Sequence, residues 1–312
     1  MSSSISTSEV GRQFAIMLGA ALSAFAITLA IGVTHFQSAV ADQARLMNVR
    51  LVAERHRIAM IDAFIAANAQ SDLPLVVVLG DSQSWGFRHR PERVFTAHLQ
   101  AALPDVKVLN LSVVDGRIAD QVAIIGLIKD RGIRPSLIVT SANLGQLKAP
   151  EFRRLTDSVL PFWTYLLSPL NVYRLGELFP PKDARETADM AYRRFQVPDR
   201  FLDSPQRVQE MARQVASMLE AAQDIADRVL FYMPPHATED FGSYGYNRGL
   251  YHRQVRAMLE ACKQSGASCT DLSAALPLGA FQDVVHLNRR GHVLLARKLQ
   301  PEIVQLLSQP DR

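Results

Sequence analysis

Two cysteines are all that the sequence holds in 312 residues, and it has no paired His or Cys spacing typical of a metal site. Its basic residues are not interleaved with aromatic ones, although the formal net charge is +4, so they do not resemble a nucleic-acid-binding surface. We therefore expect no metal, no cofactor and no nucleic-acid partner. With 48% hydrophobic and 21% charged residues, the composition excludes a disordered chain and is typical of a globular one.

Charged residues are also missing from positions 13–36, a run long enough to cross a bilayer as a helix of about 20 residues. A secretory signal peptide is the alternative, because Ala39-Val40-Ala41 offers a small-x-small cleavage site. The apolar run exceeds the about 7 to 15 residues usual in a signal peptide, which favours an uncleaved anchor. The predicted organisation is a tail at 1–12, a transmembrane anchor at 13–36, a stalk helix or linker at 37–72 and a folded domain at 73–312.

The stalk has apolar residues at helical spacing, so it either joins the membrane to the domain or packs on the domain as an ordinary helix. Within the domain, short runs rich in Val, Ile or Leu alternate with longer amphipathic stretches. Such an alternation is typical of a parallel sheet covered on both faces. We expect a flavodoxin-like three-layer α/β/α sandwich with the site at the carboxyl ends of its strands. The five predicted strands are Leu75 to Leu79, Val106 to Leu111, Ser136 to Ser141, Arg228 to Met233 and Ala267 to Asp271.

The stretch between Leu144 and Asp227 is too long for one crossover helix, although its last part, Pro205 to Ala226, has a clear helical pattern. We expect a helical insertion at about 145–205. It is rich in aromatic residues and Leu but is broken by prolines, so it is too interrupted to span a bilayer. It could cap the site, lie on the membrane surface, dock on a membrane partner through residues such as Trp163, or pack on the main core.

A candidate nucleophile stands at the end of the first predicted strand, where Gly80-Asp81-Ser82 is followed by a predicted helix. This arrangement places the Ser82 hydroxyl at the carboxyl edge of a sheet, beside the N–H groups of a helix start. A serine needs a general base, and Asp283 stands three residues before His286 near the C-terminus. At that spacing Asp283 can hold one imidazole nitrogen while the other faces the serine.

The two motifs, GDSxSxG at 80–86 and DxxHLNxxGH at 283–292, resemble those of the SGNH, or GDSL-type, serine esterases and acyltransferases. The resemblance covers most of 73–307 outside the insertion and implies a triad of Ser82, Asp283 and His286. Within that family the anchor, the altered third motif and the insertion resemble the membrane-anchored alginate and peptidoglycan O-acetylation proteins and the D-alanyl-transfer proteins. Those proteins work beside a multi-span membrane acyltransferase, so the resemblance implies such a partner.

The resemblance also implies donors for an oxyanion. The Ser82 N–H is one, and Asn143 matches the side-chain amide of the family's third motif, although its flanking Gly and Asp are replaced here. The family's second motif, Asn-x-Gly, corresponds to Asn110-Leu111-Ser112, with Gly116 four residues on. Either Ser112 or Gly116 could supply the backbone N–H.

Several other polar residues near these motifs have alternative interpretations. We interpret Asp81 as a structural residue that bonds to neighbouring loops, because side chains adjacent in sequence diverge. Trp85 could line the acyl pocket or pack under the first helix. The Gly- and Tyr-rich loop at 238–246, which follows His236, is a predicted substrate-facing lip, and His292 is interpreted as a packing or capping residue. A basic cluster, which is a solvated helix end or an anion site, comprises Arg88, His89, Arg90 and Arg93.

Cys262 and Cys269 flank a helix-to-strand loop, so they either form a disulfide or are two unpaired small hydrophobic residues. Four arginines follow the run at 13–36 and one precedes it, which alone would leave the domain in the cytoplasm. Large C-terminal domains cross despite such charges, and the resemblance implies an envelope protein. We therefore predict a single-pass inner-membrane protein with its domain on the periplasmic side.

Three functions follow from these observations. The first is a membrane-anchored esterase or O-acyltransferase acting on acyl esters of cell-envelope glycans. The second is a periplasmic lipase or thioesterase whose acyl acceptor is water. The third is a non-catalytic glycan-binding or scaffold module, which predicts that Ser82, Asp283 and His286 lie outside hydrogen-bond reach of one another, or that the site is blocked.

Overall fold

The computed structural model describes residues 16–27, 30, 58–87, 89, 91–113, 116–143, 205–244 and 247–309. Residues 16–27 are helical, and the rest of the predicted anchor at 13–36, apart from residue 30, lies outside these ranges. In the ranges given, no helix has both the length and the apolar character needed to cross a membrane. The predicted insertion, with Trp163, also lies outside the described residues.

The centre of the fold is a five-stranded parallel sheet in the order β2-β1-β3-β4-β5. Each predicted strand is confirmed to within one or two residues at either end, because side chains buried on both faces produce continuous apolar runs. Only β5, at the edge, is half-buried. The strands are β1 (Leu75–Leu79), β2 (Lys107–Asn110), β3 (Leu137–Ser141), β4 (Val229–Met233) and β5 (Ser268–Asp271).

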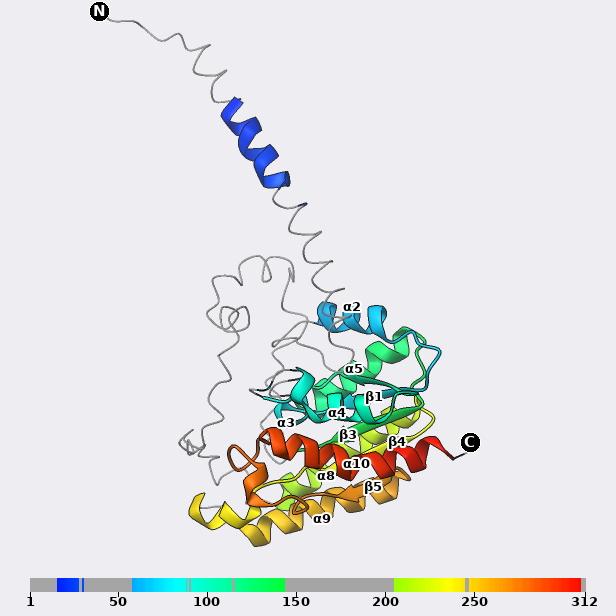
Figure 1. Ribbon diagram of the computed structural model, residues 1–312, viewed down its shortest axis with the longest axis vertical. Helices are drawn as coiled ribbons and strands as arrows, with labels where there is room; N and C mark the ends of the chain where they lie inside the picture. Colours follow the sequence, from blue (N-terminus) through cyan, green and yellow to red (C-terminus); the bar gives the residue numbers. More distant parts are fainter. Residues whose placement is uncertain are drawn as a thin grey trace, which may run out of the picture.

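Helices cover both faces of the sheet and make the predicted three layers (Figure 1). One face carries α4 (Phe95–Ala102) and α10 (Arg289–Leu307), which pack on each other and on Val76 and Val78 of β1. The other face carries α2 (Ile58–Asn68), α5 (Ile118–Asp130), α8 (Pro205–Gln223) and α9 (Arg248–Ser265). The shorter elements are α3 (Ser82–Trp85), η1 (Pro91–Arg93), η7 (Thr238–Tyr244) and η8 (Leu278–Ala280).

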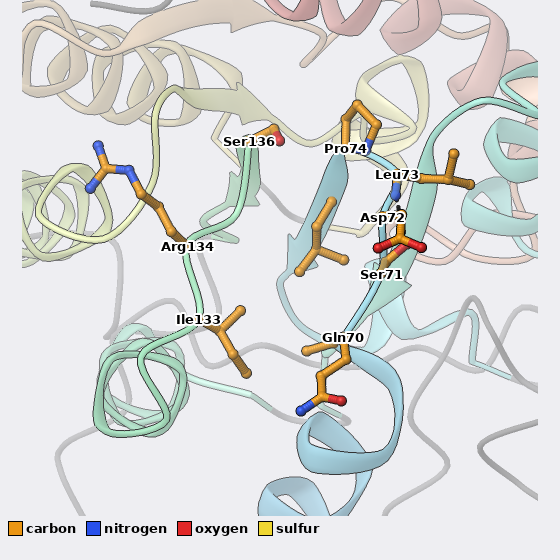
Figure 2. Close-up of a pocket in the computed structure, with 10 residues that line it drawn as sticks. Gln70, Ser71, Asp72, Leu73, Pro74, Ile133, Arg134 and Ser136 are labelled. Atoms are coloured by element: carbon orange, nitrogen blue, oxygen red, sulfur yellow. Dashed lines mark hydrogen bonds between the residues drawn. The ribbon is translucent and has the colours of Figure 1, made fainter.

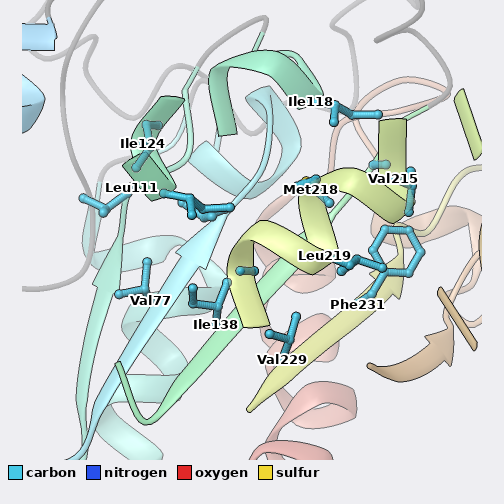
Figure 3. Packing of buried hydrophobic residues seen from close by; sticks show 14 of the residues in the cluster. Val77, Leu111, Ile118, Ile124, Ile138, Val215, Met218, Leu219, Val229 and Phe231 are labelled. Atoms are coloured by element: carbon cyan, nitrogen blue, oxygen red, sulfur yellow. The ribbon is translucent and has the colours of Figure 1, made fainter. Parts of the chain in front are cut away.

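The face under α5 and α8 is packed by side chains that alternate along the strands with those of the opposite face. Val77, Ile138 and Phe231 point from the sheet to Met218 and Leu219 of α8 (Figure 3). All five are at most 1% exposed, so each is worth about 1.5 to 3 kcal/mol of burial relative to an exposed side chain. The predicted helix from Pro205 is confirmed as one layer of the core.

The end of the predicted stalk is part of this core. In α2, Ile61, Phe64 and Ile65 are buried against the face that also carries α5. Asp62, on the outer side of α2, pairs with Arg131 at the end of α5. For residues 58–68 the second alternative therefore holds, a helix packed on the domain, while residues 37–57 lie outside the described ranges.

A disulfide joins Cys262 of α9 to Cys269 of β5, with 6.1 Å between their Cα atoms. Of the two alternatives for these cysteines, the structure therefore contains the bonded one. The bridge closes the short turn at Gly266 and ties the edge strand to the helix that covers it.

Candidate active site

The turn after β1 is shaped to present Ser82. A Cβ on Gly80 would lie 2.5 Å from Ser84 Oγ, so only glycine allows the chain to approach α3 this closely. Asp81 is the N-cap of α3, and its Oδ1 accepts a hydrogen bond from the Gln83 N–H at 2.9 Å. Ser82 is therefore the first residue of α3, directly beyond the carboxyl end of β1.

Ser82 lies against the loop that precedes α10. Its Oγ is 3.0 Å from His286 Nε2, and His286 Nδ1 is 2.8 Å from Asp283 Oδ2. The side chains of His286 and Asp283 are 15% and 20% exposed, so the histidine is reachable from solvent but mostly enclosed. The contacts expected between these three residues are therefore present.

Asp283 is held as an acceptor for His286. Its Oδ1 accepts the N–H groups of Val285 at 2.9 Å and of His286 at 2.6 Å. Burial raises the pKa of Asp283, but the hydrogen bond and charge of His286, together with these two N–H groups, outweigh it and leave the pKa below its usual value. An ionised Asp283 places the proton on Nδ1, which leaves Nε2 as an acceptor for the Ser82 hydroxyl.

The residues that follow His286 fix the loop against α10. Asn288 caps this helix by accepting the Gly291 N–H at 3.0 Å, and its amide donates to Gly279 O at 2.9 Å. A Cβ on Gly291 would lie 2.1 Å from Ala280 O, so a larger residue there would push η8 away from the helix. Helix capping thus explains Asn288 of the C-terminal motif, and close packing explains Gly291.

Gln83 is a buried residue of the site that sequence reasoning did not single out. It is 1% exposed, and its Nε2 donates to Pro235 O at 2.7 Å and to Val285 O at 2.5 Å. The side chain next to the serine therefore joins the loop after β4 to the loop that carries His286. Its position beside Ser82 was the only signal in the sequence.

The two backbone donors proposed from the second motif, Ser112 and Gly116, have hydrogen-bond acceptors within their own loop. The Ser112 N–H donates to Asn110 Oδ1 at 3.0 Å, and the Gly116 N–H donates to Val113 O at 2.9 Å. The first is an Asx turn, in which the short asparagine side chain takes the N–H two residues on. In this structure the N–H groups of Ser112 and Gly116 therefore each have an acceptor within their own loop, and their role as oxyanion donors stays a prediction.

Asn143 follows β3 and lies beside the nucleophile turn. Its side chain is hydrogen-bonded to Asp81, and its Oδ1 is 3.2 Å from His236 Nε2. Burial holds the pKa of Asp81 above its usual value, although the hydrogen bonds from Gln83, Asn143 and Ser84 and the charge of His286 act in the opposite direction. Asp81 has the structural contacts expected of it, as a cap and as the partner of Asn143.

His236 belongs to the interior of the site and not to its lip. It is 4% exposed, and burial lowers its pKa to about 4, so it is neutral near pH 7. Its Nδ1 lies 2.9 Å from Pro234 O and 3.0 Å from the hydroxyl of Tyr251. The predicted substrate-facing lip is the loop at 238–246 that follows, and the His236 ring centroid lies 6.5 Å from that of Phe241 in this loop.

The ring of Phe87 lies against His286. The Phe87 ring centroid is 4.8 Å from that of His286. His89 Nε2 lies 3.0 Å from Leu287 O, so this member of the basic cluster faces the His286 loop, while Arg88 and Arg90 lie outside the described residues. His292 is buried and its Nδ1 accepts the Phe95 N–H at 3.3 Å, which agrees with its interpretation as a packing residue. Trp85 is half-buried.

A pocket of about 600 Å³ lies at the opposite, amino-terminal edge of the sheet (Figure 2). It is lined by the segment from Ala69 to Leu75, between α2 and β1, and by Ile133, Arg134 and Ser136 before β3. Neither Ser82 nor His286 contributes to it. We therefore place the candidate site at the carboxyl edge, where the polar contacts converge.

Comparison with known proteins finds similarity in structure alone. No family model matches the chain, and a search of curated proteins finds no match. A member of the lipolytic G-D-S-L family from Veillonella parvula is 13% identical with a TM-score of 0.48, covering 74% of this chain and 98% of its own. TesA is 16% identical with a TM-score of 0.47, covering 74% and 99%.

A third solved structure is a catalytic mutant of an acetylxylan esterase from Geobacillus stearothermophilus. It is 12% identical with a TM-score of 0.44, covering 76% of this chain and 95% of its own. Likeness at this level does not assign a function. The function proposed below therefore rests on the geometry of the site.

Proposed function

We propose that this protein is a membrane-anchored serine esterase or O-acyltransferase that works through an acyl-serine intermediate on Ser82. The observation that carries the proposal is the pair of contacts Ser82 Oγ to His286 Nε2, at 3.0 Å, and His286 Nδ1 to Asp283 Oδ2, at 2.8 Å. A serine within reach of an imidazole that a carboxylate orients is the arrangement that nucleophilic acyl transfer needs. The same contacts count against a non-catalytic module in which these side chains lie apart.

In the first half-reaction, His286 Nε2 takes the hydroxyl proton as Ser82 Oγ bonds to the carbonyl carbon of an acyl ester. The bond from that carbon to the leaving oxygen then breaks, and His286 gives the proton to the departing alcohol. In the second half, water or a sugar hydroxyl loses its proton to Nε2 and bonds to the acyl carbon. The bond to Ser82 Oγ breaks, and the serine recovers the proton.

The negative oxygen of each tetrahedral intermediate needs donors. Ser82 N–H is one, because the first N–H groups of a helix have no partner within it. The Asn143 amide is the second, since its side chain lies at the Asp81 turn. Loss of one such donor costs about 2.7 to 4 kcal/mol of transition-state stabilisation in hydrolases of this chemistry.

The proposed substrates are acyl esters of cell-envelope glycans, handled at the periplasmic face of the inner membrane with a multi-span acyltransferase as partner. The charge-free run at 13–36 supports an anchor. The Cys262–Cys269 disulfide supports an oxidising compartment. Water as acceptor would make the protein a periplasmic lipase or thioesterase instead.

The test uses the full chain in detergent with short-chain aryl esters, with and without glycan acceptors. We expect Ser82→Ala and His286→Ala to lower the turnover at least 10³-fold, because each removes one member of the nucleophile–base pair. Ser136→Ala, in the pocket at the amino edge, is the matched control and should leave the rate unchanged. Ester cleavage that survives Ser82→Ala would refute the proposal.

Mass spectrometry identifies the acceptor. Acyl groups found on the glycan support a transferase, and release of free acid alone supports the water-accepting hydrolase. A fluorophosphonate should label Ser82 in the unaltered protein and fail to label His286→Ala at a comparable rate.

A further inference from the structure

A chain of buried hydrogen bonds runs behind the nucleophile. The Tyr251 hydroxyl is 3.0 Å from His236 Nδ1, His236 Nε2 is 3.2 Å from Asn143 Oδ1, and the Asn143 amide bonds to Asp81. All four residues are at most 8% exposed. The proposed acyl transfer uses neither Tyr251 nor His236, although this chain of hydrogen bonds ends at Asp81, one residue before Ser82.

His236 could take either of two tautomers, and each matches one orientation of the Asn143 amide. With the proton on Nε2, the ring donates to Asn143 Oδ1, and the amide nitrogen faces Asp81. With the proton on Nδ1, the ring donates to Pro234 O at 2.9 Å, and Nε2 would accept from an amide turned the other way. A turned amide would point its oxygen at Asp81.

Two contacts favour the first arrangement. Asp81 already accepts the N–H groups of Gln83 and Ser84, as expected of a carboxylate, so an amide oxygen facing it would be repelled. The Tyr251 hydroxyl can donate or accept, and it lies closer to His236 Nδ1 than to Ser273 O, 3.0 Å against 3.4 Å, so it can donate to a bare Nδ1. In that arrangement the proton is on Nε2, and the donation from Tyr251 together with the bond to Asn143 must outweigh the approach of Pro234 O, an acceptor 2.9 Å from Nδ1 that alone would favour the Nδ1–H form.

We propose that His236 is a positioning residue whose Nε2–H fixes the Asn143 amide with Nδ2 directed at the Asp81–Ser82 turn. This inference rests on the proposed function, since it makes Asn143 an oxyanion donor. An amide nitrogen carries two hydrogens, so Nδ2 can donate to Asp81 and to an oxyanion together. His236 thereby selects a donor and excludes an acceptor at the place where negative charge develops.

A pair of variants tests which ring nitrogen matters. In His236→Gln the amide nitrogen can take the place of Nε2 and donate to Asn143, whereas in His236→Asn the shorter side chain reaches only the place of Nδ1. We expect His236→Asn and His236→Phe to lower kcat about tenfold with KM unchanged, and His236→Gln to keep most of the activity. Equal losses in the Gln and Asn variants at equal thermal stability would overturn the inference.

A double-mutant cycle tests whether His236 acts through Asn143. Asn143→Ala should lower kcat about 10²-fold. Adding His236→Phe should then cost nothing more, whereas independent contributions would multiply. If Asn143→Ala leaves kcat unchanged while Ser82→Ala abolishes turnover, the inference fails and the proposed function stands; if Ser82→Ala has no effect, the proposed function itself fails.

The tautomer can be read directly by ¹⁵N-detected NMR of the full chain with labelled histidine. We expect His236 to show a protonated Nε2 and a bare Nδ1 at pH 7. Tyr251→Phe, which removes the donor to Nδ1, should shift the population toward the Nδ1–H form and lower kcat in proportion. An Nδ1–H ring in the unaltered protein would overturn the inference.

Discussion

The two edges of the sheet are built from different interactions. At the carboxyl edge, buried polar side chains bond to one another and to the loops. Gln83 donates to backbone carbonyls of two loops, Asn143 bonds to Asp81 and His236, and the hydroxyls of Ser84 and Tyr232 are 2.9 Å apart. A buried polar group costs free energy unless its hydrogen-bond partner is in place. These contacts therefore hold the side chains of the carboxyl edge in fixed positions.

The amino edge is joined by a covalent bond and by an ion pair. It carries the Cys262–Cys269 bridge and the exposed ion pair Arg134–Asp227, at 2.6 Å. It also holds the pocket of Figure 2, whose lining includes Asp72 and Ser136 but no nucleophile–base pair. Interlocked buried polar side chains thus mark the carboxyl edge, whereas the pocket lies at the other edge, away from Ser82 and His286.

The largest predicted effect is a loss of activity when a residue of the carboxyl edge is changed, with no loss for the same change at the amino edge. Asp283→Asn should lower kcat on the order of 10³-fold, because an amide no longer enforces the Nδ1–H tautomer of His286. Asp72→Asn, the same change at the other edge, should leave kcat unchanged. Steady-state kinetics at pH 8 measures both, and comparable losses in the two variants would remove the distinction.

The next effect is on acid stability. Because burial lowers the pKa of His236 from 6.5 to about 4, the unfolded chain binds a proton that the folded chain refuses between these values. The contribution of neutral, buried His236 to the free energy of unfolding is therefore fully present above pH 6.5. The free energy of unfolding falls by about 3 kcal/mol as the pH drops to 4, at 1.36 kcal/mol per pKa unit.

Urea unfolding at pH 7 and pH 4.5 measures this loss. His236→Gln should show a correspondingly smaller dependence on pH, while His252→Gln, at an exposed position of α9, should behave as the unaltered protein. A His236→Gln protein with the full acid sensitivity would assign that sensitivity to other groups.

The smallest effect belongs to the amino edge. Replacing Cys262 and Cys269 with alanine should lower the free energy of unfolding by about 2.5 kcal/mol, the chain-entropy value for a loop of this size, since the cysteines are 7 positions apart. Because the bridge lies away from Ser82, kcat should not change. A fall in kcat at temperatures where the variant remains folded would show that the edges are coupled.

The sequence predicts the sheet well because burial on both faces leaves a pattern that needs no knowledge of neighbours. Ser82, Asp283 and His286 are equally visible, since their motifs encode local turns and caps. Gln83 and His236 are not, because their roles come from contacts with residues 152 and 93 positions away. The contact of Ser112 has a local cause that the motif does not reveal, because the Asn110 side chain accepts the Ser112 N–H.

The contact between Ser82 and His286 joins residues 204 positions apart. A ribosome adds about 5 to 20 residues per second, so the nascent chain carries its serine for roughly 10 to 40 seconds before the histidine is even made. The contact also needs α10 to dock on α4, which involves the last residues of the fold. Under the proposed function, the growing polypeptide therefore has no Ser82–His286 pair, and no acyl-transfer activity from it, until the chain is nearly complete.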